Sequence, residues 1–259
     1  MKDALLTTPP VQDESARAAP AGLCKRLWRE SAAEWKFSPG LVAMIWWAPF
    51  VIVLLGLVAA LIGGNVYRVL TGEDRLAENL QVYCWLLAFG MGWLVIQRLG
   101  KAGRYGMAFL YFCLIAGIFV IIGEEVSWGQ RLFGWETPDA LKVVNRQHET
   151  NIHSLDGMVD TFRSLYLLIG AYGTILPVLF YRARPSAIYQ KFISLLVPHI
   201  TLVPYFLATF AWRIYLSFWK LPEKYYFEIS KYSEVVELIL ALGFLLFISF
   251  QFRKIKPHG

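Results

Sequence analysis

The sequence predicts an all-α membrane protein, a polytopic bundle of about six transmembrane helices. Of the 259 residues, 57% are hydrophobic and 17% are charged, and the mean hydropathy is +0.47. A water-soluble domain usually carries about 25% charged residues. The charged residues are confined to the two ends of the chain and to short spacers between long apolar blocks. Many of the ten Trp and thirteen Tyr residues stand at block edges, which is typical of the aromatic belts at membrane interfaces.

Six blocks within residues 39–253 reach the length of about 20 apolar residues that a membrane-spanning helix needs. In the fifth block, Pro198 and Pro204 predict a kink or a tilt. A polar outer loop, residues 125–160, separates the third block from the fourth, and residues 254–259 form a short tail. The blocks lie at about 41–63, 80–98, 106–124, 162–181, 191–218 and 234–252.

The N-terminal region is expected to lie outside the membrane. Residues 1–21 are rich in Ala, Pro, Thr and charge, which predicts a disordered tail. Residues 22–38 are predicted to form an amphipathic helix on the membrane surface, because one stripe of the helix is mainly apolar and the basic residues fall elsewhere. The members of this stripe are Leu23, Leu27, Trp28, Ser31 and Trp35.

Basic residues predict the orientation, because cytoplasmic loops are enriched in Lys and Arg. The N-terminal segment, the spacers after the second and fourth blocks and the C-terminal tail are all rich in Lys and Arg. Six spans place all four on one side, so we expect both termini in the cytoplasm and a multi-pass protein of the inner (plasma) membrane. The net charge of +6 has the same origin. We expect membrane lipids as partners and no nucleic acid, since no basic and aromatic face lies outside the membrane.

The richest polar chemistry begins where the third block ends. Glu124 and Glu125 follow seventeen nearly unbroken apolar residues, so at least one carboxylate is expected below the headgroup level. The following spacing continues the helix and would place Glu124, Ser127 and Arg131 on one face. Gln130 belongs to the same segment. The alternative is that the two glutamates only mark the helix end, with a satisfied carboxylate beside Arg131.

A second polar cluster lies within the outer loop, at residues 145–153. Its alternation allows an extended segment with five polar side chains on one side. Such a segment would line the site rather than lie in lipid, because a non-helical backbone at membrane depth must be buried in protein or line water. The five residues are Asn145, Gln147, Glu149, Asn151 and His153.

A metal site is one alternative for this cluster. His148 and Glu149 begin like the zinc-binding HExxH motif, which needs a second His four residues after the first. His153 is five residues away, so the motif is rejected. A looser site made of Glu149, His153 and a membrane carboxylate is left open, and no metal or other cofactor is assigned.

The last two spans bring further charge to the same depth. Arg213 lies near the outer end of the fifth block, and Glu234 and Glu237 begin the sixth, one turn apart. Ionisable residues are costly in lipid and normally face a bundle interior or an aqueous cavity. We therefore expect Arg213 to pair with one of the glutamates in a pocket shared with the outer loop. Snorkelling of Arg213 and a helix-dipole role for Glu234 are the alternatives.

Residues 124–131, with the sequence EEVSWGQR, and the polar series that ends at His153 resemble a signature of uncharacterised bacterial multi-pass membrane proteins. The resemblance covers about thirty residues and the six-helix layout. It implies the fold and no particular activity.

Three functions are considered: an enzyme acting on a lipid or isoprenoid at the outer leaflet, a cation- or proton-coupled transporter, and a non-catalytic subunit whose outer loop docks a protein partner. A cavity that opens sideways to lipid would favour the first, a continuous polar tunnel the second, and fully paired carboxylates without a cavity the third. The candidate catalytic residues are Glu124, Glu125, Ser127, Glu149 and His153. The candidate substrate-binding residues are Gln130, Arg131, Asn145, Asn151, Arg213, Glu234 and Glu237.

Overall fold

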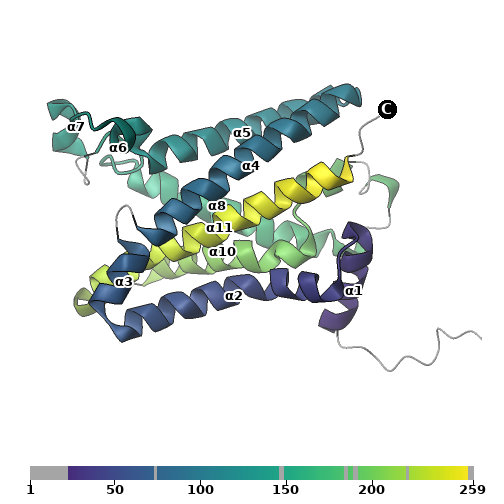
Figure 1. Cartoon of the computed structure of the whole chain (residues 1–259), viewed down its shortest axis with the longest axis horizontal. Helices are drawn as coiled ribbons and strands as arrows, with labels where there is room; N and C mark the ends of the chain where they lie inside the picture. Colours follow the sequence, from purple (N-terminus) through teal and green to yellow (C-terminus); the bar gives the residue numbers. More distant parts are fainter. Residues whose placement is uncertain are drawn as a thin grey trace, which may run out of the picture.

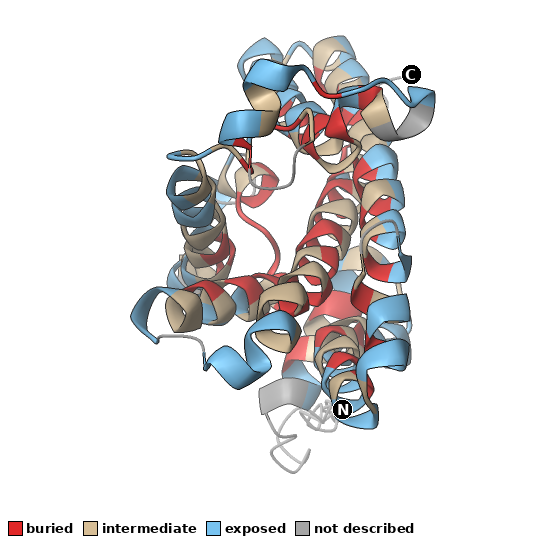
Figure 2. Cartoon of the chain, turned by 90° about the vertical axis from the view of Figure 1, so that its left-hand side faces the viewer, coloured by how far each residue is buried: buried red, intermediate tan, exposed pale blue. Residues whose placement is uncertain are grey.

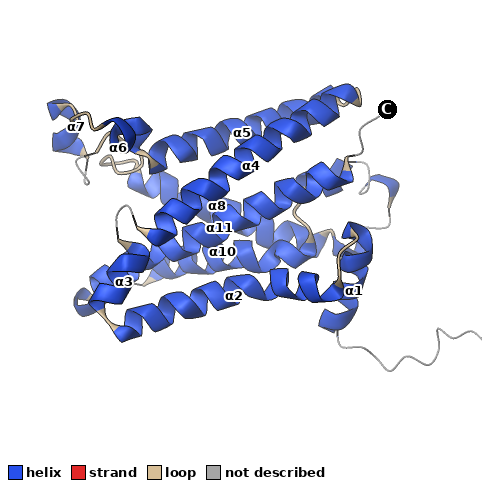
Figure 3. Ribbon diagram, in the orientation of Figure 1, coloured by secondary structure: helices blue, strands red, loops and turns tan. Residues whose placement is uncertain are grey.

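The computed structural model describes residues 23–72, 75–145, 149–183, 186–188, 192–219 and 222–255. Within these ranges the chain forms helices joined by loops, and no strand occurs (Figures 1 and 3). Six helical segments are long and apolar enough to cross a membrane. The prediction of an all-α, multi-pass membrane bundle is therefore confirmed. The predicted disordered tail, residues 1–21, lies outside the described residues.

The spans are built on six long helices; the short helix α9 belongs to the fifth span, and the other short helices lie toward the ends of the bundle. The long helices are α2 (Pro39–Ile62), α4 (Leu76–Lys101), α5 (Tyr105–Glu125), α8 (Val159–Leu179), α10 (Val203–Phe218) and α11 (Tyr226–Lys254). The short helices are α1 (Leu23–Trp35), α3 (Gly64–Thr71), α6 (Gln130–Phe133), α7 (Asp139–Val144) and α9 (Ser194–Leu196).

Helix α11 is the centre of the bundle. It packs along α4 and also contacts α10 and α2, while α5 packs on α4 and α8 packs on α10. Buried residues gather where helices face one another, and outward faces are exposed (Figure 2). The exposed residues include large apolar side chains such as Leu54, Leu61 and Phe109. Apolar outward faces are the arrangement that a bilayer requires.

The two ends of the bundle carry different elements. Helix α1 and the end of α11 lie at one end, and α6 and α7 lie at the opposite end, which we call the loop end (Figure 1). The two ends of the described chain thus share one side, as an even number of spans demands. Leu27 and Ser31 on the predicted apolar stripe of α1 are buried, so this stripe packs against the bundle.

The fifth span is broken rather than kinked. Helix α9 ends at Leu196, a 3-10 turn covers Ile200–Leu202, and α10 begins at Val203 with Pro204 in its first turn. Proline has no N–H for the helical ladder, so two prolines six residues apart interrupt the hydrogen bonding of this segment. The ring of His199 accepts a hydrogen bond from the backbone N–H of Thr201 and starts the new turn.

The sixth helix starts earlier than the sequence predicts. Helix α11 begins at Tyr226, eight residues before Glu234, because Tyr232, Val235 and Val236 extend its buried face against Ala59 and Tyr67 of α2 and α3. Glu234 and Glu237 consequently lie inside the helix. The helix-dipole explanation of Glu234 is therefore wrong, since the effect is confined to the first turn.

Candidate functional site

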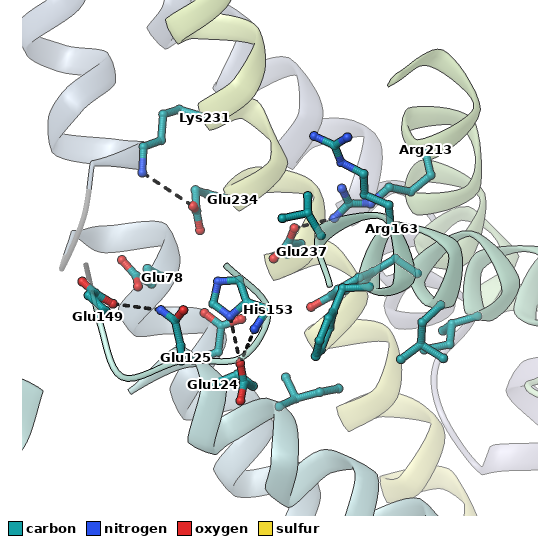
Figure 4. Close-up of a pocket in the computed structure, with 17 residues that line it drawn as sticks. Glu78, Glu124, Glu125, Glu149, His153, Arg163, Arg213, Lys231, Glu234 and Glu237 are labelled. Atoms are coloured by element: carbon teal, nitrogen blue, oxygen red, sulfur yellow. Dashed lines mark hydrogen bonds and ion pairs between the residues drawn. The ribbon is translucent and has the colours of Figure 1, made fainter. Parts of the chain in front are cut away.

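A pocket of about 200 Å³ lies at the loop end of the bundle, between five of the long helices and the outer loop (Figure 4). Glu125 of α5, Arg213 of α10 and Glu237 of α11 all line it, so the expected convergence of three spans is found. The basic side chains of Arg163 and Lys231 also face the pocket. Its glutamates are Glu78, Glu124, Glu125, Glu149, Glu234 and Glu237.

The pocket is shaped by a left-handed turn that ends α5. The backbone φ angles of Ser127, Trp128 and Gly129 are 46°, 53° and 94°, so three consecutive residues leave the right-handed helical region. The prediction that the helix continues to Arg131 is therefore wrong, and Glu124 and Ser127 do not share a helical face. The side chain of Arg131 lies outside the described part of the structure.

This turn folds Trp128 back onto the last turn of α5. A Cβ atom on Gly123 would lie 3.0 Å from the Trp128 ring, so glycine lets the indole pack directly on the helix. The indole Nε1–H of Trp128 donates to Glu124 Oε1 at 2.7 Å. The Gly-Glu-Glu-x-Ser-Trp-Gly segment thus encodes one compact turn that locks the Glu124 carboxylate.

Glu124 then binds the outer loop. Its Oε2 accepts the backbone N–H groups of Ile152 and His153, each at 2.7 Å, and lies 3.1 Å from His153 Nδ1. Four donors therefore converge on one carboxylate whose side chain is 5% exposed. Hydrogen bonds to the ionised form stabilise it, so Glu124 is a carboxylate that holds both the loop and the imidazole.

His153 presents its second ring nitrogen to the pocket. Because Glu124 is an acceptor, the Nδ1 atom of His153 carries the proton and the neutral ring keeps Nε2 as an acceptor. The His153 side chain is 35% exposed and lines the pocket, and Phe162 of α8 contacts its ring edge-on. This buried carboxylate beside a half-exposed imidazole has the geometry of a general base with its orienting group.

Two of the candidate substrate-binding residues, Gln130 and Asn145, form hydrogen bonds within the outer loop. Gln130 donates to Thr137 Oγ1 and accepts from the backbone N–H of Thr150, both at 2.7 Å. Asn145 donates to the backbone carbonyl of Asn151 at 2.8 Å and to its side-chain oxygen at 2.9 Å. Gln130 and Asn145 do not line the pocket, so their contacts position the loop rather than meet a ligand.

Ser127 and Glu149 are joined by a hydrogen bond from the serine hydroxyl to the glutamate carboxylate. Glu149 also accepts from Asn151 Nδ2 at 3.1 Å. Ser127 is fully buried and does not line the pocket, whereas Glu149 and Asn151 do. Ser127 therefore contacts the candidate catalytic residue Glu149 but does not itself face the pocket.

The extended-segment alternative for residues 145–153 is not what the described residues show. Asn145 forms an isolated antiparallel bridge with Leu155, and the described chain from Glu149 onward runs in bends and turns. The segment nevertheless returns to the site, because Asn151 and His153 line the pocket. Gln147 and His148 lie outside the described residues.

Arg213 pairs with Glu237 as expected. The Arg213 Nη2 atom donates to Glu237 Oε1 at 2.6 Å, and its guanidinium lies 4.7 Å from the Tyr166 ring centre. The two side chains are only 9% and 17% exposed, which explains the close pairing at this depth. Arg213 Nε is buried and has no hydrogen-bond partner among the described groups. Glu234 lies 4.0 Å from Lys231, one turn before it on α11.

Gln81 is a site residue that the sequence reasoning missed. It is fully buried on α4, and its Nε2 donates to Glu125 Oε1 at 2.6 Å. An uncharged polar residue at the start of the second apolar block was the available signal. Glu78 lies one turn earlier on the same helix and lines the pocket, so α4 contributes to the site together with α5, α8, α10 and α11.

A metal site would need several ligand side chains close together. Among the described residues, no group of three or more His, Cys, Asp or Glu side chains is arranged to hold a metal ion. The looser site of Glu149, His153 and a membrane carboxylate is therefore not assembled in this part of the chain.

Comparison with known proteins found no matching family model, no matching curated protein and no matching solved structure.

Proposed function

We propose that this chain is an enzyme embedded in the inner (plasma) membrane that acts on a lipid or isoprenoid substrate at the outer leaflet. The observation that carries the proposal is the His153 ring, oriented by the buried Glu124 carboxylate and facing a pocket built from five helices and the outer loop. A loop-capping carboxylate alone would not need an exposed imidazole as one of its four donors.

The chemistry assigned to this pair is proton transfer. His153 Nε2 takes a proton from a water molecule or a substrate hydroxyl, while Nδ1–H remains bound to Glu124. The ionised Glu124 stabilises the imidazolium that forms and keeps the ring from rotating. Glu125 and Glu237 lie in the same pocket and each accepts a hydrogen bond, from Gln81 and Arg213 respectively.

Arg213 is the proposed anchor for an oxygen of the substrate. Its Nη2 is bound to Glu237, but the Nε–H is buried without a partner among the described groups. Because Nε is covered by protein, a substrate oxygen would meet the part of the guanidinium that lines the pocket. A phosphate or carboxylate oxygen is the natural acceptor for a guanidinium.

The two other functions have less support. A transporter requires a polar path across the membrane, yet the cavity adjoining the pocket is lined almost entirely by apolar side chains. A purely structural subunit would be expected to fill the space between its paired carboxylates, and here a pocket remains. The stacked and exposed Phe133 and Trp135 of the outer loop are compatible with a docking role in addition to catalysis.

The test is lipid turnover by purified protein. The full chain is incubated with a total lipid extract of the expression host, and the lipids are compared by mass spectrometry before and after. We expect wild type to consume a lipid species and His153→Gln to do so about 10²–10⁴-fold more slowly, the usual contribution of a general base.

The matched control is His199→Gln, which alters the other described histidine at the opposite end of the bundle, where it contacts Glu34 and Thr201. This variant should turn over lipid like wild type. Equal lipid profiles for wild type and His153→Gln, with both proteins folded, would end the proposal.

A further inference from the structure

A second cavity, of about 440 Å³, lies between α5 and α8. Leu110 and Leu114 of α5 and Leu168 of α8 form its sides, and Phe206 of α10 with Phe244 of α11 forms its floor. We call this cavity the apolar groove. It exists because α5 packs on α4 while α8 packs on α10, which leaves the space between α5 and α8 without a helix of its own.

Two glycines of α8 allow this helix to pack closely against α10. A Cβ atom on Gly173 would lie 2.1 Å from the Phe206 ring, and one on Gly170 would lie 2.7 Å from the backbone nitrogen of Phe210. The two glycines of α8 therefore allow α8 to pack closely on α10. Because α8 packs on α10, it does not close the space beside α5.

The groove is apolar in its hydrogen-bonding behaviour as well as in its residue types. Its two hydroxyl groups belong to Tyr111 and Tyr172, and both already donate to backbone carbonyls. Tyr111 donates to Leu195 at 2.6 Å and Tyr172 to Leu196 at 3.0 Å. An apolar lining without spare donors favours hydrocarbon over water or ions.

The apolar groove adjoins the polar pocket. Ile169 of α8 lines both cavities. On α5 the lining passes from Ile121 in the pocket to Leu110 in the groove, eleven residues that correspond to about 16 Å along the helix axis. A molecule with a polar head and one apolar chain could thus occupy the pocket and the groove together.

We propose that the apolar groove binds one acyl chain of the substrate lipid, with the head group of that lipid in the pocket beside His153. This inference rests on the proposed function and narrows it to an acyl-chain lipid. The sides of the groove carry exposed Leu110 and Leu168, which face the bilayer between two spans. Bilayer acyl chains run alongside these helices, so a chain enters sideways without leaving the membrane.

A transmembrane helix from a second chain is a poorer occupant. A helix about 10 Å wide and 16 Å long fills roughly 1,250 Å³, which exceeds the empty space of about 1030 Å³ that the groove offers even with its open mouth included. A single hydrocarbon chain is much narrower than a helix and can lie within the groove. Its contacts with Phe206, Phe244 and the leucines would be favourable, because closely packed atoms gain dispersion energy.

Photo-crosslinking in native membranes tests the proposal. Cells producing the full chain are grown with a fatty acid that carries a diazirine, the membranes are irradiated, and cross-linked peptides are mapped. We expect adducts concentrated on Leu110, Leu114 and Leu168. The substitutions Leu110→Trp and Leu168→Trp fill the groove and should lower these adducts severalfold.

The matched controls are Leu86→Trp and Leu87→Trp, which place the same side chain on the exposed face of α4. They should leave the groove adducts unchanged. Adducts spread evenly over α2, α4 and the groove, or groove adducts that persist in Leu110→Trp and Leu168→Trp, would overturn the proposal. Groove adducts that are displaced when a polyisoprenyl phosphate is added would overturn it in favour of an isoprenoid.

The His153→Gln variant separates this inference from the proposed function. His153 does not line the groove, so the variant should keep the groove adducts of wild type while losing lipid turnover. Specific adducts in a wild-type protein that consumes no lipid would mean that the groove binds a chain and the proposed enzyme is wrong. Lipid turnover with evenly spread adducts would mean the reverse.

Discussion

At the residue scale, the centre of the site is the Glu124 carboxylate. It accepts four hydrogen bonds, from Trp128, from the backbone of Ile152 and from the backbone and ring of His153. One side chain therefore fixes the turn after α5, the return of the outer loop and the tautomer of the histidine. Its structural and chemical roles are inseparable, since the same contacts that satisfy a buried charge also aim the imidazole.

The substitution Glu124→Gln should destabilise the protein by about 2 kcal/mol, because an amide has one acceptor oxygen, so its NH2 group must face either the Trp128 indole or the loop donors. The substitution Trp128→Phe removes one donor and should cost about 1 kcal/mol. Apparent melting temperatures in lipid nanodiscs should therefore fall in the order wild type, Trp128→Phe, Glu124→Gln. The control Trp93→Phe changes a tryptophan on α4 that is 49% exposed and should match wild type. Equal melting temperatures for wild type and Glu124→Gln would contradict the role assigned to the carboxylate.

At the element scale, the approach of α8 to α10 determines where the groove lies. Gly173 meets the fully buried Phe206 ring, and Gly170 meets the backbone of Phe210. Small residues at such contacts let helix backbones approach closely in a membrane, where packing rather than the hydrophobic effect drives association.

Gly173→Ala should therefore destabilise the bundle by about 1–3 kcal/mol, the usual cost of forcing a methyl group into a packed interface. The matched control is Gly117→Ala on α5, where an added Cβ would meet nothing within 4 Å. That control should be neutral or slightly stabilising, because alanine is the better helix former. Thermal unfolding of the two variants in the same nanodiscs checks the difference. If Gly173→Ala is as stable as wild type, α8 does not depend on this contact.

The sequence predicted the elements better than their ends. Apolar length sufficed for six spans, because a membrane helix must bury its backbone in hydrogen bonds over about 20 residues. It could not locate the start of α11, because Tyr226 to Ser233 mix polar and aromatic residues, and the packing of Tyr232 against α2 and α3 is not visible in the sequence. The turn at Ser127 and Trp128 was equally hidden, since a left-handed backbone at non-glycine residues depends on the bonds of Glu124 and Glu149.

The sequence predicted several of the residues that line the pocket, but it did not predict the role of each residue. Membrane depth brought Glu125, Arg213 and Glu237 into one pocket, as charge in lipid requires. The role of Glu124 as the orienting partner of His153 depends on a loop that folds back 29 residues later, and no local pattern encodes that return. The contact of Gln81 with Glu125 was not predicted, because one uncharged amide within an apolar block changes the hydropathy of that block little.

At the scale of the whole molecule, the pocket belongs to the loop end, opposite the end that holds α1 (Figure 1). Which leaflet supplies the substrate therefore depends on the orientation of the whole bundle. The basic residues of the spacer between α4 and α5, and of the last turn of α11, lie at the α1 end. From the positive-inside rule we expect that end to lie in the cytoplasm and the pocket to lie at the outer leaflet.

Thiol labelling in intact cells tests this assignment. In a background with Cys24, Cys84 and Cys113 replaced by alanine, single cysteines are introduced as Val143→Cys on α7, where the residue is 84% exposed, and as Lys101→Cys at the exposed end of α4. A membrane-impermeant maleimide should label Val143→Cys from outside, and it should reach Lys101→Cys only after the membrane is permeabilised, because charged reagents do not cross hydrocarbon. The opposite pattern would invert the bundle and move the His153 pocket to the cytoplasmic leaflet. The pocket chemistry would be unchanged, but the substrate would then have to come from the cytoplasmic leaflet.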